Sequence, residues 1–491
     1  MDTMKLLTGF RKFFPLLFLL LIISCRKNSG PESKISGLEP SFNYDTVKFN
    51  DWPEIKASGR LTAILRNSPT GYFLYKGRPM GFEYELLNRF CEQRNIALDI
   101  ILESDIEKCF AMLQEGKCDI VAHSLTITKE RRKNMEFTMP QYTVRHMLVQ
   151  RLPDNYRTMK LHEIENFLIR DPIDLIGKEI HVRKNASYVQ RLKNLSGEIG
   201  GDIHITEEFG DILTEDLIGM VARKEINYTV ADEDIANITA TYYSNLDVKT
   251  PLSFPTQIGW AVRKNSPALL NELNTWIRVI KLLPDYNVIY KRYFNDPKGY
   301  LHRLSSDFSS IGGNRISPYD PLIKKYAKKI GWDWKLLAAM IYHESRFNPK
   351  AESWAGAMGL MQVIPETGEL YGTKNILDAE QNIRAGSEHL LVLTKFWKAR
   401  IGDNADLIKY ILASYNVGQG HVEDAMRLTE KYKRDPRKWN DNVEYFLLKK
   451  SEPYYYEDDV SQSGYCRGEE PVEYVKEILN GYSIYSQLVS D

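Results

Sequence analysis

The chain carries its plainest helical pattern in Asp333-Trp-Lys-Leu-Leu-Ala-Ala-Met-Ile-Tyr-His-Glu-Ser-Arg-Phe-Asn-Pro349. The Asp is a suitable N-cap, and the apolar spacing after it predicts a helix that runs to about Ser345. Glu344 shares one helix face with Leu337 and Ile341, because the three are spaced i, i+4 and i+7. Burial disfavours an ionised carboxylate, so Glu344 is expected to hold a proton near neutral pH and to act as a general acid. The alternative is that the last helical turn frays and exposes Glu344 to solvent.

Further segments follow this helix in a fixed order. They are Ser353, then Gly356-Ala-Met-Gly-Leu-Met-Gln362, then Ala413-Ser-Tyr-Asn-Val-Gly418, and finally Glu473-Tyr-Val475. Together with His343-Glu-Ser-Arg-Phe-Asn-Pro349, they resemble the goose-type-lysozyme-like lytic transglycosylases. The resemblance implies a mainly helical, lysozyme-like domain over residues 318–491, with the glycan strands of peptidoglycan as its partner.

The resemblance also implies roles for single residues. Glu344 corresponds to the family's sole catalytic acid and base. The residues that would contact the glycan are Ser353, Gln362, Tyr415, Asn416 and Tyr474. The family's Ala in its A-Y-N element is Ser414 here, which is one small residue in place of another. For Tyr474 the alternative is an ordinary position in the core.

The chemistry implied by these motifs needs one carboxyl group, whereas retaining and inverting glycosidases usually use two. In the family, the N-acetyl oxygen of the substrate assists, and the deprotonated Glu then takes the proton of the sugar's 6-hydroxyl. The resemblance therefore implies non-hydrolytic cleavage of the MurNAc–GlcNAc β-1,4 bond, which leaves 1,6-anhydro-MurNAc ends. The competing hypothesis is a periplasmic sensor of muropeptides or amino acids whose helical domain is inactive and only docks on glycan.

Strand and helix patterns alternate in the N-terminal half, from about residue 58 to residue 295. This succession predicts a bilobed α/β domain with parallel or mixed sheets and a hinged cleft. Lobe 1 is expected over about 58–148 and 252–295, and lobe 2 over about 149–251. Residues 296–317 are rich in turn formers and are predicted to be a linker. The expected fold class is thus multidomain, with the α/β domain first and the helical domain second.

Two segments of this half, Pro79-Met-Gly-Phe-Glu-Tyr-Glu-Leu-Leu and Cys118-Asp-Ile-Val-Ala-His-Ser-Leu-Thr-Ile-Thr-Lys-Glu-Arg131, resemble the periplasmic solute-binding proteins for amino acids. The resemblance implies a regulatory ligand site, in which Ser124, Thr126 and Arg131 hold a ligand carboxylate. A guanidinium suits this role because it forms two parallel charge-assisted hydrogen bonds. Ser187 and Asp232 correspond more loosely to the hydroxyl and the amine-binding acid of the second lobe.

Two alternatives stay open for this site. Arg131 lies in the charged run Lys129–Lys133, where it could be an ordinary solvated residue. Ile106 stands where amino-acid binders stack an aromatic ring on the ligand. The expected ligand is therefore an amino acid or a cell-wall peptide, and a different ligand or none is the alternative.

The first 25 residues are typical of an export signal. Basic residues precede the apolar run Phe13–Ile23, which is too short to span a bilayer. The run ends in Ser24-Cys25, which resembles the lipobox of bacterial lipoproteins. The resemblance implies a signal peptide over 1–24, a lipidated Cys25 on a tether over 25–57, and an outer-membrane lipoprotein of the cell envelope facing the periplasm. The alternative is a short uncleaved anchor with an incidental Cys.

The amino-acid composition limits which partners and cofactors can be expected. Lys and Arg total 65, as do Asp and Glu, so a nucleic-acid partner is not expected. The nine histidines are scattered and no Cys/His group has ligand spacing, so neither a metal site nor a cofactor is expected. Four cysteines follow Cys25, and the sequence leaves their pairing open: Cys91, Cys109, Cys118 and Cys466.

Overall fold

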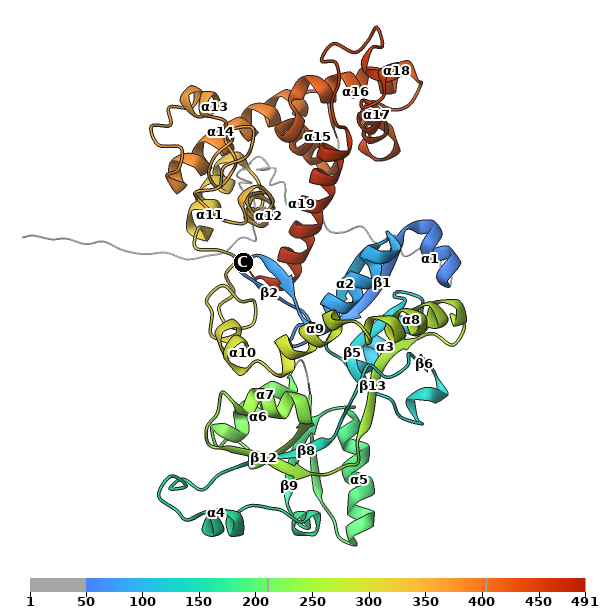
Figure 1. Cartoon of the computed structure of the whole chain (residues 1–491), viewed down its shortest axis with the longest axis vertical. Helices are drawn as coiled ribbons and strands as arrows, with labels where there is room; N and C mark the ends of the chain where they lie inside the picture. The colour runs from blue at the N-terminus through green and yellow to red at the C-terminus, as the bar shows by residue number, and fades with distance from the viewer. Residues whose placement is uncertain (1–49, 210–211, 403, 491) are drawn as a thin grey trace, which may run out of the picture.

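The computed structural model describes residues 50–209, 212–402 and 404–490. Lobe 2, lobe 1 and the helical domain follow one another along the long axis of the molecule (Figure 1). This arrangement confirms the predicted fold class, a bilobed α/β domain followed by a mainly helical one. The predicted signal peptide, Cys25 and most of the tether lie outside the described residues.

Lobe 1 is built on a mixed sheet with strand order β4-β1-β5-β13-β6, and β7 also pairs with β13. The strands β4, β1 and β5 are parallel, whereas β13 runs antiparallel to its neighbours. Helices cover the sheet, which explains why Leu61–Leu65 reads as a nearly continuous apolar run. The strands are β1 (Arg60–Leu65), β4 (Ala97–Leu102), β5 (Ile120–Thr126), β6 (Glu136–Phe137), β7 (Tyr142–Val144) and β13 (Thr256–Val262). The helices are α1 (Trp52–Ser58), α2 (Phe82–Arg94), α3 (Ile106–Gln114), α8 (Pro267–Ile280) and α9 (Pro284–Phe294).

Lobe 2 has a five-stranded sheet with the order β10-β9-β11-β8-β12. Its core is formed by apolar side chains of β9, β11 and α5, among them Ile180, Val182 and Leu192. The strands are β8 (His146–Arg151), β9 (Glu179–Arg183), β10 (His204–Glu208), β11 (Tyr228–Asp232) and β12 (Leu246–Pro251). The helices are α4 (Leu161–Phe167), α5 (Ser187–Ile199), α6 (Thr214–Ala222) and α7 (Glu233–Ala240).

The chain crosses between the lobes twice. The first crossing lies next to residue 145, because β8 begins at His146 and pairs with β11 and β12 of lobe 2. The predicted boundary at residues 148 and 149 is therefore wrong by about three residues. The second crossing follows Pro251, where β12 ends.

The helical domain surrounds the long helix α19. Helices α12 and α15 both pack on α19. The helices are α11 (Asp320–Ile330), α12 (Trp334–Ser345), α13 (Pro365–Leu370), α14 (Ala379–Lys398), α15 (Asn404–Val417), α16 (Gln419–Lys431), α17 (Glu444–Lys449), α18 (Pro453–Tyr456) and α19 (Glu469–Leu488). Within the described ranges, no helix is both long enough and apolar enough to cross a bilayer.

Two segments that were predicted to be irregular, one at each end of the α/β domain, contain short helices. The predicted tether includes α1, whose N-cap Asp51 also accepts hydrogen bonds from the backbone of α8 at Ala268 and Leu269. The predicted linker over 296–317 includes α10 (Pro297–Leu304), which Asp296 caps by accepting from the amide of Gly299. In both places the sequence prediction is wrong because an acidic cap and a proline begin a short helix there.

A β-hairpin extends from lobe 1 towards the helical domain. It consists of β2 (Phe73–Tyr75) and β3 (Arg78–Met80). The rest of the linker pairs with it, because Leu74 and Ser310 exchange two hydrogen bonds of 2.9 Å and the amide of Lys76 donates to the carbonyl of Phe308. The linker is thus held against the α/β domain.

The turn of this hairpin contacts the helical domain at Gly77. Its carbonyl accepts a hydrogen bond of 2.7 Å from the hydroxyl of Tyr485 on α19. Gly77 has a φ of 78°, and a Cβ there would lie 2.6 Å from the ring of Phe347 and 2.8 Å from that of Tyr342. Only glycine fits this close approach. Figure 1 shows α19 descending from the helical domain to this hairpin.

Candidate active site and ligand pocket

The predicted helix is present as α12, with Asp333 as its N-cap. Leu337 and Ile341 are fully buried, which confirms the apolar face that Glu344 shares. The helix ends immediately after Ser345, because Arg346 adopts a left-handed conformation and its amide returns to the carbonyl of Tyr342. Glu344 therefore sits in an ordered last turn rather than a frayed one.

The Glu344 carboxyl group is partly buried and faces α19. The hydroxyl of Tyr474 donates a hydrogen bond of 2.5 Å to its Oε1. Burial raises the pKa of Glu344 to about 7, although the Tyr474 hydrogen bond acts in the opposite direction. No second carboxylate among the described residues contributes to this shift. The side chain can hold a proton near neutral pH and release it, as a general acid and base must.

Tyr474 itself is 3% exposed and lies in the core of the helical domain. Its ring packs edge-on against His343, the neighbour of Glu344 on α12. The core position given as the alternative for Tyr474 is therefore the one observed, and its contact with the glycan stays a prediction. Its hydroxyl positions the carboxyl group of Glu344.

Tyr415 lies on α15, and its hydroxyl donates to the carbonyl of Met361 at 2.8 Å. Burial, and to a smaller extent the charge of Glu344, raises the pKa of Tyr415, so the phenol stays neutral. Ser414, the departure from the family's A-Y-N element, is buried, and its hydroxyl accepts from the indole of Trp397 at 2.8 Å. The additional hydroxyl thus has a partner and does not disturb the site.

Ser353 and Gln362 lie on the loop between α12 and α13. The hydroxyl of Ser353 accepts from the amide of Ala357, and the side-chain amide of Gln362 donates to the carbonyls of Ala351 and Gly359. A Cβ at Gly359 would lie 2.4 Å from Asn382, so this position requires glycine. Both predicted contact residues therefore also hold the loop in shape.

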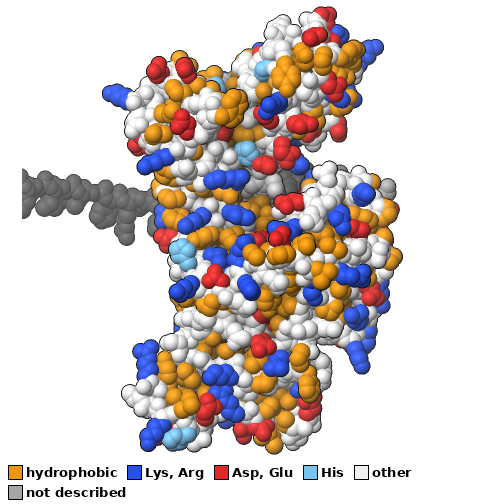
Figure 2. Space-filling view, viewed as in Figure 1, with side chains coloured by type: hydrophobic (Ala, Val, Ile, Leu, Met, Phe, Trp, Pro, Cys, Tyr) orange, Lys and Arg blue, Asp and Glu red, His pale blue; other side chains and the backbone are white. Residues whose placement is uncertain are grey.

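Asn416 follows Tyr415 and is exposed. Figure 2 shows the helical domain hollowed between the part formed by α13 and α14 and the part formed by α16 to α18. Trp354 was not predicted from the sequence; it is 98% exposed next to Ser353. An exposed indole is a flat apolar surface beside the predicted glycan contacts.

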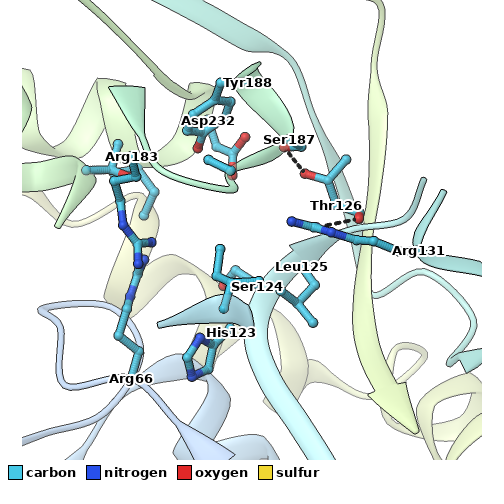
Figure 3. A pocket seen from close by; sticks show the side chains of 14 residues that line it. Arg66, His123, Ser124, Leu125, Thr126, Arg131, Arg183, Ser187, Tyr188 and Asp232 are labelled. Carbon is cyan, nitrogen blue, oxygen red and sulfur yellow. Dashed lines mark hydrogen bonds between the residues drawn. The ribbon is translucent and has the colours of Figure 1, made fainter. Parts of the chain in front are cut away.

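A second site lies between the two lobes of the α/β domain. The pocket brings together all five residues predicted for a regulatory ligand, namely Ser124, Thr126, Arg131, Ser187 and Asp232 (Figure 3). Ile106 also lines it, at the place where amino-acid binders stack an aromatic ring. The predicted residues therefore share one cavity.

Arg131 is not an ordinary solvated residue. Its guanidinium lines the pocket and donates to the carbonyl of Thr126 at 2.9 Å. Burial lowers the pKa of Arg131 to about 10, and the guanidinium stays charged at neutral pH. The hydroxyl of Ser187 in lobe 2 donates to that of Thr126 in lobe 1 at 3.0 Å, so this side of the pocket bridges the lobes.

Ser124 is held by a residue that the sequence analysis missed. Glu83 on α2 is 1% exposed, and its carboxylate accepts from both the amide and the hydroxyl of Ser124 and from the indole of Trp260. Ser124 has a φ of 52°, an unusual backbone conformation that these bonds stabilise. Because its hydroxyl proton is already donated to Glu83, Ser124 shapes the pocket and offers a ligand only an acceptor.

Asp232 ends β11 and is 8% exposed. Burial raises its pKa to about 7. Its Oδ1 has no hydrogen-bond partner among the described residues, and His146 approaches it only to 3.7 Å. Burial lowers the pKa of His146 to about 4, so this imidazole is neutral at pH 7. The free oxygen can accept a hydrogen bond from a cationic ligand.

Two further arginines line the pocket and were also missed. Arg66 directly follows β1, and Arg183 is the last residue of β9. The carboxyl ends of parallel strands are the usual binding edge of an α/β sheet, and this signal could have identified both.

All four described cysteines are buried as free thiols, and no disulfide joins them. No group of three or more His, Cys, Asp or Glu in the described parts of the chain is placed to hold a metal ion.

Comparison with known proteins gives a family for each half of the chain. Residues 61–296 match the model of the bacterial extracellular solute-binding proteins, family 3. Residues 321–439 match the model of the Transglycosylase SLT domain.

Relatives match across both halves together. A membrane-bound lytic murein transglycosylase F of Desulfosudis oleivorans is 33% identical over 434 residues, which are 88% of this chain and 91% of the relative. The chain belongs to the membrane-bound lytic murein transglycosylase F family. A member of this family from Saccharophagus degradans is 32% identical and covers 88% of this chain and 83% of the relative.

Membership of this family confirms both resemblances and the order of the two domains in the chain. A transglycosylase F chain is a lytic transglycosylase with a solute-binding-type domain before its catalytic domain. Its relatives are named membrane-bound, which places the chain in the cell envelope. Glu344 thus lies within the matched transglycosylase domain, whereas Tyr474 lies beyond the last matched residue.

The α/β domain also resembles solved structures. A mutant of ArgBP from T. maritima has a TM-score of 0.41 at 22% identity and covers 50% of this chain and 99% of that chain. An ancestral amino acid-binding protein, a precursor of cyclohexadienyl dehydratase, has a TM-score of 0.40 at 23% identity and covers 49% and 98%.

Proposed function

We propose that the helical domain cleaves the MurNAc–GlcNAc β-1,4 bond of peptidoglycan and that Glu344 is its only acid and base. The supporting observation is that Tyr474 positions the Glu344 carboxyl group and that burial raises its pKa to about 7, so one residue can act first as acid and then as base. Most glycosidases use two carboxyl groups instead. In the proposed mechanism the substrate supplies the second group.

In this mechanism the protonated Glu344 donates its proton to the glycosidic oxygen, and the N-acetyl oxygen of MurNAc attacks C1 as the C1–O bond breaks. The Glu344 carboxylate then takes the proton of the MurNAc 6-hydroxyl, whose oxygen attacks C1 and displaces the N-acetyl oxygen. Glu344 regains its proton and no water is added. Tyr474 positions the carboxyl group, and Ser353, Gln362, Tyr415 and Asn416 lie around the glycan.

The test is digestion of purified sacculi followed by mass spectrometry of the products. Wild type is expected to give anhydro ends, which are lighter than reducing ends by one water. Glu344→Gln keeps the side-chain shape but cannot donate the proton, so cleavage should fall by about 10²- to 10⁴-fold while glycan binding persists. Glu369→Gln on the exposed face of α13 is the matched control and should cleave normally.

Other results would contradict specific parts of the proposal. Reducing ends as the main product would indicate a hydrolase. Undiminished cleavage by Glu344→Gln would mean that another residue is the catalyst. Glycan binding without cleavage by wild type would support the inactive docking domain instead.

The α/β domain is proposed to bind a small regulatory ligand with a carboxylate, such as an amino acid or a cell-wall peptide. The support is a pocket between two lobes that brings Arg131 and Asp232 into one cavity. Arg131→Ala should weaken ligand binding by roughly 10- to 150-fold, because it removes a charge-assisted pair of about 1.5–3 kcal/mol. Arg131→Lys should recover little of it, since Lys lacks the planar fork.

The chain is further proposed to be an outer-membrane lipoprotein anchored by Cys25 after removal of residues 1–24. The support is the short apolar run and the lipobox-like sequence at its end. Cys25→Ala should leave the protein in the soluble fraction or stalled as a precursor. Fractionation of cells with antibody detection measures this, and soluble wild-type protein would refute the anchor.

A further inference from the structure

The pocket between the lobes contains more positive charge than the residues predicted from the sequence supply. Three guanidinium groups line it, those of Arg66, Arg131 and Arg183, against the single lining carboxylate of Asp232. His123 adds no charge, because burial lowers its pKa to about 3. Figure 3 shows Arg131 on one side of the cavity and Arg66 with Arg183 on the other. The pocket thus has two separate cationic ends.

None of these three arginines forms an ion pair within 4 Å with a carboxylate of the described residues. Arg131 and Arg183 donate to backbone carbonyls, those of Thr126 and Ser104, which carry no net charge. The Nε atom of Arg66 is buried and has no hydrogen-bond partner in the described part of the chain. The donors therefore have capacity left for an anion in the cavity.

Glu215 on α6 offsets part of this charge. It is 9% exposed, and both of its oxygens lack a hydrogen-bond partner among the described residues. Burial lowers the pKa of Arg183 to about 10, and the charge of Glu215 acts in the opposite direction. Asp234, behind Asp232, keeps its proton because burial and the charge of Asp232 raise its pKa. Three guanidinium groups then face the carboxyl groups of Asp232 and Glu215, so cationic groups are in excess around the pocket. A ligand with more carboxylate than ammonium groups suits this excess.

The arrangement of the groups also limits how the ligand's charges are distributed. Asp232 has an oxygen without a hydrogen-bond partner among the described residues, and none of the three arginines forms an ion pair with it within 4 Å, so it suits an ammonium group. Arg131 can bind one carboxylate beside it, and the pair Arg66 and Arg183 can bind a second one across the cavity. The direct bond between Ser187 and Thr126 closes the side near Arg131, which favours a small ligand.

We infer that this pocket binds an acidic amino acid, with Arg131 on the α-carboxylate, Asp232 on the ammonium group, and Arg66 and Arg183 on the side-chain carboxylate. The inference rests on the proposed ligand-binding role of the α/β domain and names the ligand class for it. A basic amino acid is excluded by the same contacts, because its side chain would place a cation against two guanidinium groups.

The experiment is isothermal titration calorimetry of the full chain with L-glutamate, L-aspartate, D-glutamate, L-glutamine, L-arginine and glutarate. At least one of the acidic amino acids should bind about 10- to 150-fold more tightly than glutamine, because only the acid forms the second charge-assisted pair. Glutarate lacks the ammonium group and should bind more weakly than glutamate. Arginine should give no heat of binding.

Variants test whether Arg66 and Arg183 are responsible for the preference for glutamate over glutamine. Arg66→Gln and Arg183→Gln should each lower the ratio of glutamate to glutamine affinity towards one, while glutamine binding stays measurable. Lys184→Gln is the matched control, since it removes one charge from the exposed neighbour of Arg183 and should leave the ratio unchanged. The wild-type ratio itself requires no variant to fold.

The outcomes separate this inference from the proposal on which it rests. Glutamine or arginine binding as tightly as the acidic amino acids would overturn the inference and leave a ligand-binding domain in place. An unchanged ratio in both Arg66→Gln and Arg183→Gln would also overturn it. If no amino acid binds at all, the inference and the amino-acid part of the regulatory proposal both fail, whereas sacculus digestion still tests the enzyme.

Discussion

At the scale of single residues, the proton of Glu344 is controlled by two opposing effects. Burial favours the neutral carboxyl group, and the hydrogen bond from Tyr474 favours the carboxylate. Burial is the larger effect, and the pKa of about 7 makes both forms available near neutral pH. This is the property that one residue needs when it serves first as acid and then as base.

The rate of cleavage should therefore fall as the pH rises above about 7, because the first step needs the protonated form of Glu344. Tyr474→Phe removes the hydrogen bond that lowers the pKa of Glu344. The decline in rate on the alkaline side of the pH profile, its falling limb, should therefore begin at a higher pH. The measurement is kcat/KM against pH on a soluble glycan, which separates a moved limb from a uniform loss of activity. A limb that stays in place or moves to lower pH in Tyr474→Phe would contradict this assignment.

Stability should depend on the same proton. The pKa of Glu344 is higher in the folded chain, about 7, than its ordinary value of 4.5, so the folded state binds the proton more tightly. The contribution of this tighter proton binding to the free energy of unfolding is fully present below pH 4.5 and is lost as the pH rises through 7. Glu344→Gln, which cannot ionise, should be more stable than wild type at pH 8, by up to about 3 kcal/mol. Urea unfolding at pH 5 and pH 8 measures the difference, and an advantage at pH 5 alone would refute it.

At the scale of elements, the hairpin β2–β3 is the contact between the α/β domain and the helix ends that carry the catalytic residues. Its turn touches Tyr342, which is two residues before Glu344, and Tyr485, which is on the helix of Tyr474. A change in this turn should therefore alter the packing of α12 and α19.

Gly77→Ala should destabilise this junction. The added Cβ would collide with the rings of Phe347 and Tyr342, and the left-handed backbone alone costs about 1–2 kcal/mol. Gly177→Ala is the matched control, because Gly177 has a similar φ of 72° but nothing within 4 Å of its Cβ. Limited proteolysis of the linker at residues 305–317 should be faster in Gly77→Ala than in either the control or wild type. Equal cleavage rates in both variants would show that the contact does not hold the junction.

Helices with a strong apolar face could be predicted from the sequence, and short strands could not. The helices α2, α3, α8 and α12 lie where their periodicity places them. The hairpin strands, β6 and β7 have only two or three residues each, and their burial depends on segments distant in the chain. The same holds for the sites. Glu344 shares a face with its own helix neighbours, whereas Glu83 is buried by Ser124 and Trp260, which are 41 and 177 residues away.

At the scale of the whole molecule, a small number of bonds connects the facing lobes across the pocket. Ser187 bonds to Thr126, Arg183 bonds to the carbonyl of Ser104, and Arg131 approaches the carbonyl of Asn185 at 3.4 Å. Each such bond contributes about 1 kcal/mol. A ligand that contacts both lobes should therefore shift the population towards this bridged arrangement.

Fluorescence energy transfer between the lobes would measure this shift. Lys108 on α3 and Lys193 on α5 are exposed and can be replaced by Cys for labelling. The four described native thiols are buried and their pKa values are raised, so they should react little; wild type gives the background. L-glutamate should raise the transfer efficiency, and Arg131→Ala should abolish the change. An unchanged efficiency with a ligand that calorimetry shows to bind would mean that the lobes do not close on it.

The bond between Tyr485 and Gly77 joins residues that are 408 positions apart in the chain. The hairpin therefore precedes α19 by most of the described chain. The α/β domain can fold before α19 takes its place, because domains generally fold as units from the N-terminus. The helical domain, by contrast, lacks Tyr474 until α19 has been made. Glu344 therefore acquires its hydrogen-bond partner late, so a chain that stops before α19 has no assembled catalytic site.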